Sequence, residues 1–204
     1  EISAFVVEGG IPGLHFGKRE DKIGMRGSVT TDVIFENCQI SEENRLGEEG
    51  EGWKIAMDTL NMLRPAMGAQ AVGIGQGALD YAIQYANERI QFRKPIASFQ
   101  GIQFMIADMA TQIEAARALV YLAAAQIDAH LEEAEKLSAM AKLYASDMAM
   151  RVTTDAVQIL GGYGYMRDYP VERMMRDAKV TQIFEGPAQL HRLAIAHHLF
   201  GGDE

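Results

Sequence analysis

The sequence predicts a mainly α-helical fold, an up-and-down four-helix bundle that a few antiparallel β-strands precede. From Gly52 onward, apolar residues recur at three- and four-residue spacing, which is typical of helices. Residues 1–47 instead contain short β-branched and aromatic runs that glycine, proline and polar residues interrupt. Long helices joined by short connections pack most simply as antiparallel neighbours. We therefore expect two parts, the end of a β-domain at residues 1–47 and a helical-bundle domain at residues 48–204.

Two short strands are expected in the first part. Residues 3–8 form a β-branched and aromatic run that stops at Gly9-Gly10, and Ile11-Pro12-Gly13 is a turn signal. Residues 32–37 form a second run, which polar residues end. The chain begins with Glu1 inside a strand-like run, so we expect a fragment that lacks an N-terminal part.

Three long helices are expected in the second part, at about residues 67–90, 102–120 and 137–152. The first is rich in glycine, and each glycine weakens a helix by up to about 1 kcal/mol. The glycines therefore favour a close approach by a neighbouring helix or a ligand, although a helix can also simply tolerate them. Pro170 and Pro187 can each open a shorter helix near the end of the chain.

Composition narrows the class of function. The formal net charge is −9 and no Lys/Arg stripe is present, which argues against a nucleic-acid binder. Cys38 is the single cysteine, so an internal disulfide is excluded, and the histidines form no metal motif. No apolar run reaches the ~18 residues of a membrane span, and no secretory signal is visible. We expect a location in the bacterial cytoplasm or the mitochondrial matrix, and no metal.

Two motifs can carry chemistry or simply close helices. Residues 158–165 read Q-I-L-G-G-Y-G-Y, where glycine can cap a helix or let the backbone approach a phosphate or ribose closely. Residues 88–95 place basic side chains at a helix end, where they suit the helix dipole or hold a pyrophosphate through Arg89. In the second account Phe92 is a packing surface and Gln100 faces the same ligand. The residues alone leave both accounts open.

One carboxylate stands in an unusual setting near the end of the chain. Glu185 lies between an aromatic residue and Gly-Pro in V-T-Q-I-F-E-G-P-A-Q-L-H-R-L, residues 180–193. Most glutamates are solvated surface charges, and the pattern alone favours that account. The alternative is a general base held where one proton must be removed.

Five motifs occur in an order and spacing that are specific together, although each alone is weak. They are R-x-x-F-R-K-P at 89–95, F-Q-G-I-Q-F-x-x-A-D-M-A at 99–110, T-D-A-V-Q-I-L-G-G-Y-G-Y at 154–165, Y-P-V-E-R-M-M-R-D-A-K at 169–179 and I-F-E-G-P-A-Q-L-H-R-L at 183–193. With them the chain resembles the acyl-CoA dehydrogenase family of the short- and medium-chain type. The resemblance covers the last strands of the family's middle β-domain and its whole C-terminal helical domain.

The resemblance implies an FAD-dependent oxidoreductase of fatty acid β-oxidation. Such an enzyme dehydrogenates an acyl-CoA thioester to trans-2-enoyl-CoA and passes the electrons to electron-transfer flavoprotein. Glu185 would remove the α-proton, while the β-hydrogen leaves as hydride to the flavin. The Glu185 backbone N–H and a flavin hydroxyl would polarise the thioester carbonyl. Asn61, Arg64 and Gly186 would contact the acyl-CoA.

The resemblance also implies contacts to FAD that are shared between subunits. Arg89, Phe92 and Gln100 would contact the FAD of a neighbouring subunit near its pyrophosphate and adenosine. Pro187 and Gln189 would lie near the flavin beside the base. A shared flavin requires an oligomer, which we expect to be a homotetramer. The adenine end would be held by Gln158, Ile159, Leu160, Gly161 and Gly162.

Two departures from the family pattern leave alternatives open. Pro187-Ala188 stands where Thr-Ser is common, which removes a hydroxyl contact to the flavin, and Asn61 stands where many relatives carry Asp. One alternative is a non-catalytic helical oligomerisation fragment. Another is a relative of the acyl-CoA oxidases, which use oxygen. An enzyme of either kind must take up FAD, whereas an oligomerisation fragment need not.

Overall fold

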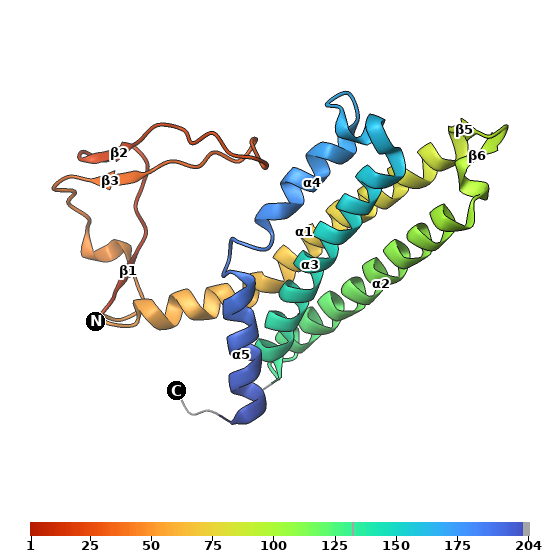
Figure 1. Cartoon of the computed structure of the whole chain (residues 1–204). Helices are drawn as coiled ribbons and strands as arrows, with labels where there is room; N and C mark the ends of the chain where they lie inside the picture. The colour runs from red at the N-terminus through yellow and green to blue at the C-terminus, as the bar shows by residue number, and fades with distance from the viewer. Residues whose placement is uncertain (132, 202–204) are drawn as a thin grey trace. The chain divides into compact units, whose positions relative to one another are not determined.

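The computed structural model describes residues 1–131 and 133–201 (Figure 1). The chain divides into two compact units, Glu1–Asn61 and Met62–Glu204, and α1 (Gly52–Glu88) contributes residues to both. The domain division between residues 47 and 48 remains a prediction, because contacts within a chain do not decide where an independently folding domain ends.

The first unit contains short antiparallel strand pairs. β1 (Ala4–Phe5) pairs with β4 (Arg45–Leu46), and β2 (Leu14–Phe16) pairs with β3 (Val33–Phe35). The strands that we expected at residues 3–8 and 32–37 are thus present but shorter. Two-stranded pairs bury little surface, and several of their large apolar side chains are exposed, namely Phe5, Phe16, Val33, Ile34 and Phe35.

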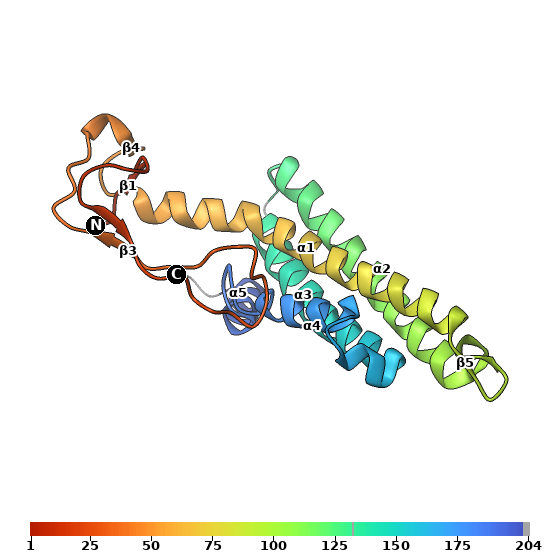
Figure 2. The ribbon, with the colours of Figure 1, turned by 90° about the horizontal axis from the view of Figure 1, so that it is seen from above.

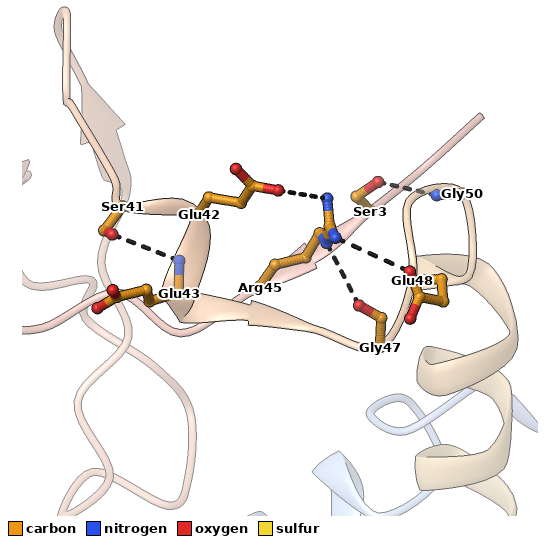
Figure 3. A network of polar contacts seen from close by, with 8 residues as sticks. All are labelled: Ser3, Ser41, Glu42, Glu43, Arg45, Gly47, Glu48 and Gly50. Atoms are coloured by element: carbon orange, nitrogen blue, oxygen red, sulfur yellow. Dashed lines mark hydrogen bonds and ion pairs between the residues drawn. The ribbon is translucent and has the colours of Figure 1, made fainter.

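A polar network fixes the path of the chain between β4 and α1 (Figure 3). The Arg45 guanidinium lies 3.6 Å from the Glu42 carboxylate and 3.9 Å from that of Glu48. The Gly50 N–H donates a hydrogen bond to the Ser3 hydroxyl at 3.0 Å, which ties this loop to the start of the chain. Because both glutamates are exposed, these ion pairs orient the loop more than they stabilise it.

The second unit is a helical bundle. The long helices α1, α2 (Gln100–Asp128) and α3 (Ala134–Leu160) run side by side in both views (Figures 1 and 2). The shorter helices α4 (Pro170–Val180) and α5 (Ala188–Phe200) both pack on α3. The predicted mainly α-helical class is therefore confirmed.

Helix α1 shows where the sequence reasoning failed and where it succeeded. The predicted start near residue 67 is wrong, because α1 continues through Pro65 even though proline removes one helical hydrogen bond. The predicted close approach of helices is confirmed at two glycines: a Cβ at Gly68 would lie 2.9 Å from Val120 Cγ2 of α2, and one at Gly75 would lie 3.1 Å from Met148 Sδ of α3. Gly73 has no neighbour within 4 Å of such a Cβ and is simply tolerated.

The core lies between α1, α2 and α3 and is rich in alanine. Small side chains allow the helices to pack closely, and a few larger apolar residues fill the remaining space. The fully buried core residues of the three helices include Ala71, Ala78, Ala82, Met109, Ile113, Ala116, Ala141, Ala145, Ala149, Val152 and Ala156.

A β-hairpin follows α1 and was not predicted. β5 (Ile90–Gln91) and β6 (Lys94–Pro95) pair antiparallel around a two-residue loop, Phe92 and Arg93. Both loop residues have positive φ, 50° and 67°, as in a type I′ turn, which ordinarily takes Asn or Gly. A Phe-Arg pair gives no turn signal, so the sequence indicated only the end of a helix here.

Candidate active site

The segment between α4 and α5 forms a tight turn. The Phe184 N–H donates to the Val180 carbonyl at 3.0 Å, and the Ala188 N–H donates to the Gln182 carbonyl at 3.1 Å. These bonds close the chain on itself just before α5 begins. The turn therefore holds its central residues, 184–187, in a fixed path against the bundle.

Glu185 lies at the centre of this turn in a strained backbone conformation. Its φ is 52°, which non-glycine residues rarely adopt, and that of Gly186 is 88°. Strained residues of this kind cluster at functional sites. The Glu185 side chain is half-buried, and no described residue forms an ion pair or hydrogen bond with its carboxylate or with its backbone N–H. Both groups are therefore available to a ligand.

Lys142 of α3 lies beneath the turn. Only 1% of its surface is exposed, and its ammonium donates a hydrogen bond to the Gly186 carbonyl at 2.7 Å. Burial, together with the weaker effect of the Arg64 charge, lowers the pKa of Lys142 to about 8, and the carboxylates of Glu185 and Asp147 oppose this shift. Sequence reasoning missed Lys142, because a single lysine in a helical repeat is usually a solvated charge.

His191 of α5 also packs against Gly186. A Cβ at Gly186 would lie 3.2 Å from His191 Cε1 and 3.3 Å from Nε2, so a side chain does not fit there. The His191 ring is 1% exposed, and neither of its nitrogens has a well-aligned hydrogen-bond partner among the described residues. Burial, then the charges of Lys142 and Arg64, lower the pKa of His191 to about 4, so the ring is neutral at pH 7.

Arg64 of α1 contributes a second buried cation. It is 8% exposed, and its Nη1 lies 3.8 Å from a Glu135 carboxylate oxygen. Its Nε and Nη1 donate no hydrogen bond to any described residue. The buried Oδ1 of Asn61 likewise accepts no hydrogen bond from any described residue. Burial lowers the pKa of Arg64, and Glu135 opposes that change. Unpartnered buried polar atoms of this kind are what a bound ligand would satisfy.

A hydrogen-bond network fastens both ends of the turn to α3. Asp147 accepts a hydrogen bond from Gln182 Nε2 at 2.6 Å and another from Arg192 Nη2 at 2.9 Å. Lys179 in turn donates to Gln182 Oε1 at 2.9 Å. One carboxylate of α3 thereby holds the residues on either side of Glu185.

A groove of about 870 Å³ lies at the hairpin end of the bundle. It is formed by the end of α1, the hairpin, the start of α2 and the segment that follows α3, where Gly161 caps the helix with a φ of 62°. Most of its lining is apolar or aromatic. The lining residues include Tyr85, Arg89, Phe92, Phe99, Gly101, Ile102, Met105, Ile159, Leu160, Gly162, Tyr163 and Met166.

The groove combines flat apolar surface with sites for an anion. The Arg89 guanidinium lies 5.2 Å from the centre of the Tyr163 ring, a cation–π distance. The Phe92 ring is 86% exposed at the tip of the strained hairpin. Gly101 is in the first turn of α2, a helix whose N-cap, Phe99, has no side-chain cap, so N–H groups there can receive an anion. These features fit an adenine ring and a pyrophosphate.

The structure separates the predicted FAD residues into two groups. The first group lines the groove: Arg89, Phe92, Ile159, Leu160 and Gly162. Gln100, Gln158 and Gly161 are exposed next to it without lining it. The second group, Pro187 and Gln189, is exposed beside Glu185. The predicted acyl-CoA residue Arg64 lies near this second group, since its charge acts on both Lys142 and His191.

Two further properties concern the whole described chain. Across residues 1–131 and 133–201, no set of three or more histidine, cysteine or carboxylate side chains is arranged to hold a metal ion. None of the helices in these ranges combines the length and the apolar character needed to cross a membrane.

Comparison with known proteins relates this site to a family. The model of the acyl-CoA dehydrogenase C-terminal domain matches residues 50–200. An acyl-CoA dehydrogenase of Bacillus subtilis (strain 168) is 54% identical over 203 residues, which are 98% of this chain and 53% of that protein. Acryloyl-CoA reductase (NADH) of Anaerotignum propionicum is 54% identical over 202 residues, 97% of this chain and 50% of that protein.

Solved structures also match nearly the whole chain. Butyryl-CoA dehydrogenase from Megasphaera elsdenii superposes with a TM-score of 0.95 at 49% identity, over 97% of this chain and 51% of that one. A chain from the structure of the electron transferring flavoprotein of Acidaminococcus fermentans gives a TM-score of 0.96 at 55% identity, over 98% and 52%. The chain thus spans about half the length of the curated relatives that it matches.

Proposed function

Because the chain belongs to the acyl-CoA dehydrogenase family, we propose that the protein dehydrogenates an acyl-CoA thioester between its α and β carbons and yields trans-2-enoyl-CoA. One observation carries the proposal: Glu185 presents a half-buried carboxylate that no described residue binds, on a strained turn fastened to the bundle. A carboxylate in this position can take a proton from a ligand.

Two groups of Glu185 act on the substrate, its carboxylate and its backbone N–H. Its carboxylate takes the α-proton, which the adjacent thioester makes weakly acidic. Its backbone N–H, which donates to no described residue, hydrogen-bonds to the thioester oxygen, where negative charge develops as the proton leaves. The positive φ of Glu185 orients the two groups together. Arg64, whose guanidinium is buried with unpartnered nitrogens, and Gly186 are our proposed contacts to the acyl-CoA. Asn61, whose Oδ1 is also buried without a hydrogen-bond partner, is a further proposed contact.

The cofactor of this reaction is FAD, which on binding accepts the hydride that leaves the β carbon. Arg89 and the first turn of α2 suit its pyrophosphate, and the aromatic groove suits its adenine. Gln158 and Gly161 are exposed next to that groove, and Gln189 and Pro187, which are exposed beside Glu185, would contact the flavin ring. In the tetramer that we propose, the groove receives the adenosine half of a neighbouring subunit's FAD.

The electron partner decides the direction of the reaction. We propose electron-transfer flavoprotein as the acceptor, supported by the similar chain in the structure of the Acidaminococcus fermentans electron transferring flavoprotein. The similarity to an NADH-dependent acryloyl-CoA reductase favours a second candidate, the reverse reduction of an enoyl-CoA. Both directions use Glu185 at the same atom. For the location, bacterial relatives favour the cytoplasm.

The test is an anaerobic titration of the FAD-loaded protein with butyryl-CoA and octanoyl-CoA, followed by the visible flavin band. We expect bleaching with at least one substrate. Glu185→Gln should keep FAD and slow the bleaching by roughly 10²–10⁴-fold, the usual contribution of a general base. Glu114→Gln, an exposed carboxylate of α2, serves as the matched control and should behave as the wild type.

Two outcomes would contradict the proposal. A Glu185→Gln variant that keeps more than a few per cent of the wild-type rate would remove Glu185 from the role of base. A protein that takes up no FAD under any loading condition would favour the non-catalytic helical fragment.

A further inference from the structure

The role of Lys142 is unexplained by the chemistry proposed above. It is the largest fully buried side chain of the described chain, and it carries an ammonium group into the core of the bundle. Burying a charge is unfavourable unless a partner or a function compensates for it. The residues one helical turn away from it on α3 are alanine and serine, which carry no carboxylate: Ser138, Ala139, Ala145 and Ser146.

The direct partner of Lys142 is the backbone of the Glu185 turn. Its Nζ donates to the Gly186 carbonyl at 2.7 Å, and the Phe184 ring centre is 6.0 Å away. His191 also packs against Gly186, where even a Cβ would be crowded. A strained turn with two successive positive φ angles persists only when its surroundings over-determine it. Lys142 and His191 supply that constraint.

The charges that face Lys142 come from four elements. Arg64 of α1, Asp147 of α3, Glu185 of the turn and His191 of α5 all act on it or respond to it. Asp147 already binds Gln182 and Arg192, and Arg64 lies beside Glu135. Glu185 is thus the one carboxylate of this group that no described residue binds, and the Lys142 ammonium is held near it without contact.

We propose that Lys142 is the positioning residue for the base Glu185. It holds the peptide between Gly186 and Pro187, directly after the base, in place through the Gly186 carbonyl. Its ammonium group, while protonated, favours the ionised carboxylate that must accept the proton. This inference rests on the proposed function for its catalytic consequence. The coupling between Lys142 and Glu185 does not depend on it.

The first experiment measures the coupling without any catalysis. Lysine side-chain nitrogens are labelled with ¹⁵N, and the Lys142 signal, assigned by its loss in Lys142→Arg, is titrated by NMR. We expect Glu185→Gln to lower the titration midpoint of Lys142, because the Glu185 carboxylate favours the charged ammonium. Glu114→Gln should leave the midpoint unchanged. A midpoint that does not move in Glu185→Gln overturns the proposal, whatever reaction the protein catalyses.

The second experiment uses the pH profile of kcat/KM in the FAD-loaded protein. Lys142→Met should lower kcat at least tenfold with KM within about twofold, and should move the acid limb of the profile to higher pH. Lys142→Arg retains the charge and should restore the position of the acid limb. Val152→Ala, which removes core volume from the same helix, should lower the Tm and leave the acid limb in place.

The two experiments separate the possible failures. A Lys142→Met protein that loses only thermal stability and keeps the wild-type acid limb makes Lys142 a structural residue and overturns the proposal. A wild-type protein that binds FAD but bleaches with no acyl-CoA overturns the proposed function, and the NMR titration then decides on Lys142 alone. If Lys142→Met does not fold, the same titration decides.

Discussion

Buried polar side chains surround a single strained turn, and each is explained by what it contacts. Lys142 binds the Gly186 carbonyl, His191 fills the space that glycine leaves open, and Asp147 binds the residues on either side. The result is a carboxylate, Glu185, whose own backbone is fixed while its side chain binds no described residue. This is the arrangement that a preorganised base requires.

His191 makes stability sensitive to acid. Its pKa is about 4 in the folded protein, against about 6.5 in an unfolded chain, so between these values only the unfolded state binds the proton. Stability from this group is complete above pH 6.5 and is lost as the pH falls towards 4. Between pH 7 and 4.5 we expect the unfolding free energy of the wild type to fall by about 2–3 kcal/mol more than that of His191→Gln.

Urea unfolding at the two pH values measures this difference. His197→Gln, an exposed histidine of the same helix, is the control and should show the same pH dependence as the wild type. Equal losses in His191→Gln and the wild type would show that His191 takes up its proton in the folded protein as readily as in the unfolded chain.

How far the sequence predicts the site differs from residue to residue. Glu185 could be found because its motif is specific, and Arg64 because the family resemblance extends to its position. Lys142 and His191 could not, since a lysine or histidine in a helical repeat carries no sign that its side chain points inward. Their burial depends on how α4 and α5 pack on α3, which local periodicity does not encode.

Among the elements, α1 shows how glycine serves two purposes in one helix. Gly68 lies against Val120 of α2, where a methyl group would clash, whereas Gly73 lies against open space. The sequence predicted a helix and the option of close contact, but not which glycine makes it. That choice follows from the rotation of α1 about its axis, which tertiary packing sets. The I′ hairpin after α1 was missed for a similar reason, since its strain is imposed from outside the loop.

Two alanine substitutions in α1 should have opposite signs. Gly73→Ala is expected to raise the unfolding free energy by about 0.5–1 kcal/mol, because alanine favours the helix and meets nothing. Gly68→Ala should lower it, because its Cβ would lie 2.9 Å from a stiff, β-branched valine and helix α2 would have to move. Chemical denaturation measures the unfolding free energy of both variants, and each variant serves as the control of the other. A stabilising Gly68→Ala would mean that α1 and α2 are farther apart than described.

On the scale of the whole molecule, the two groups of predicted FAD residues lie at separate places on the bundle. The groove with Arg89 is at the hairpin end, and Glu185 lies on the turn between α4 and α5. A chain that uses both for flavin binding is most simply understood if two copies share each FAD. Formation of the oligomer is therefore expected to depend on bound FAD, and FAD binding is expected to depend on the oligomer.

Arg89→Ala tests that dependence. We expect the variant to lose at least half of its bound FAD and to shift toward smaller oligomers on gel filtration, because the groove loses its cation. The flavin-to-protein absorbance ratio across the elution peak measures both together. Arg151→Ala, an exposed arginine of α3 outside the groove, is the matched control. Wild-type flavin content and wild-type size in Arg89→Ala would contradict a shared cofactor.

The backbone conformation of Glu185 also has an evolutionary consequence. A φ of 52° suits glycine or asparagine, and either would relieve about 1 kcal/mol or more of strain. Replacement of Glu185 by one of these residues would therefore stabilise the folded state. It would lower fitness only while the reaction matters to the cell. A duplicated gene that is no longer selected for activity should acquire a more stable, inactive turn within a few mutations. The residue at this position would then indicate whether the product of a descendant gene is still an active enzyme.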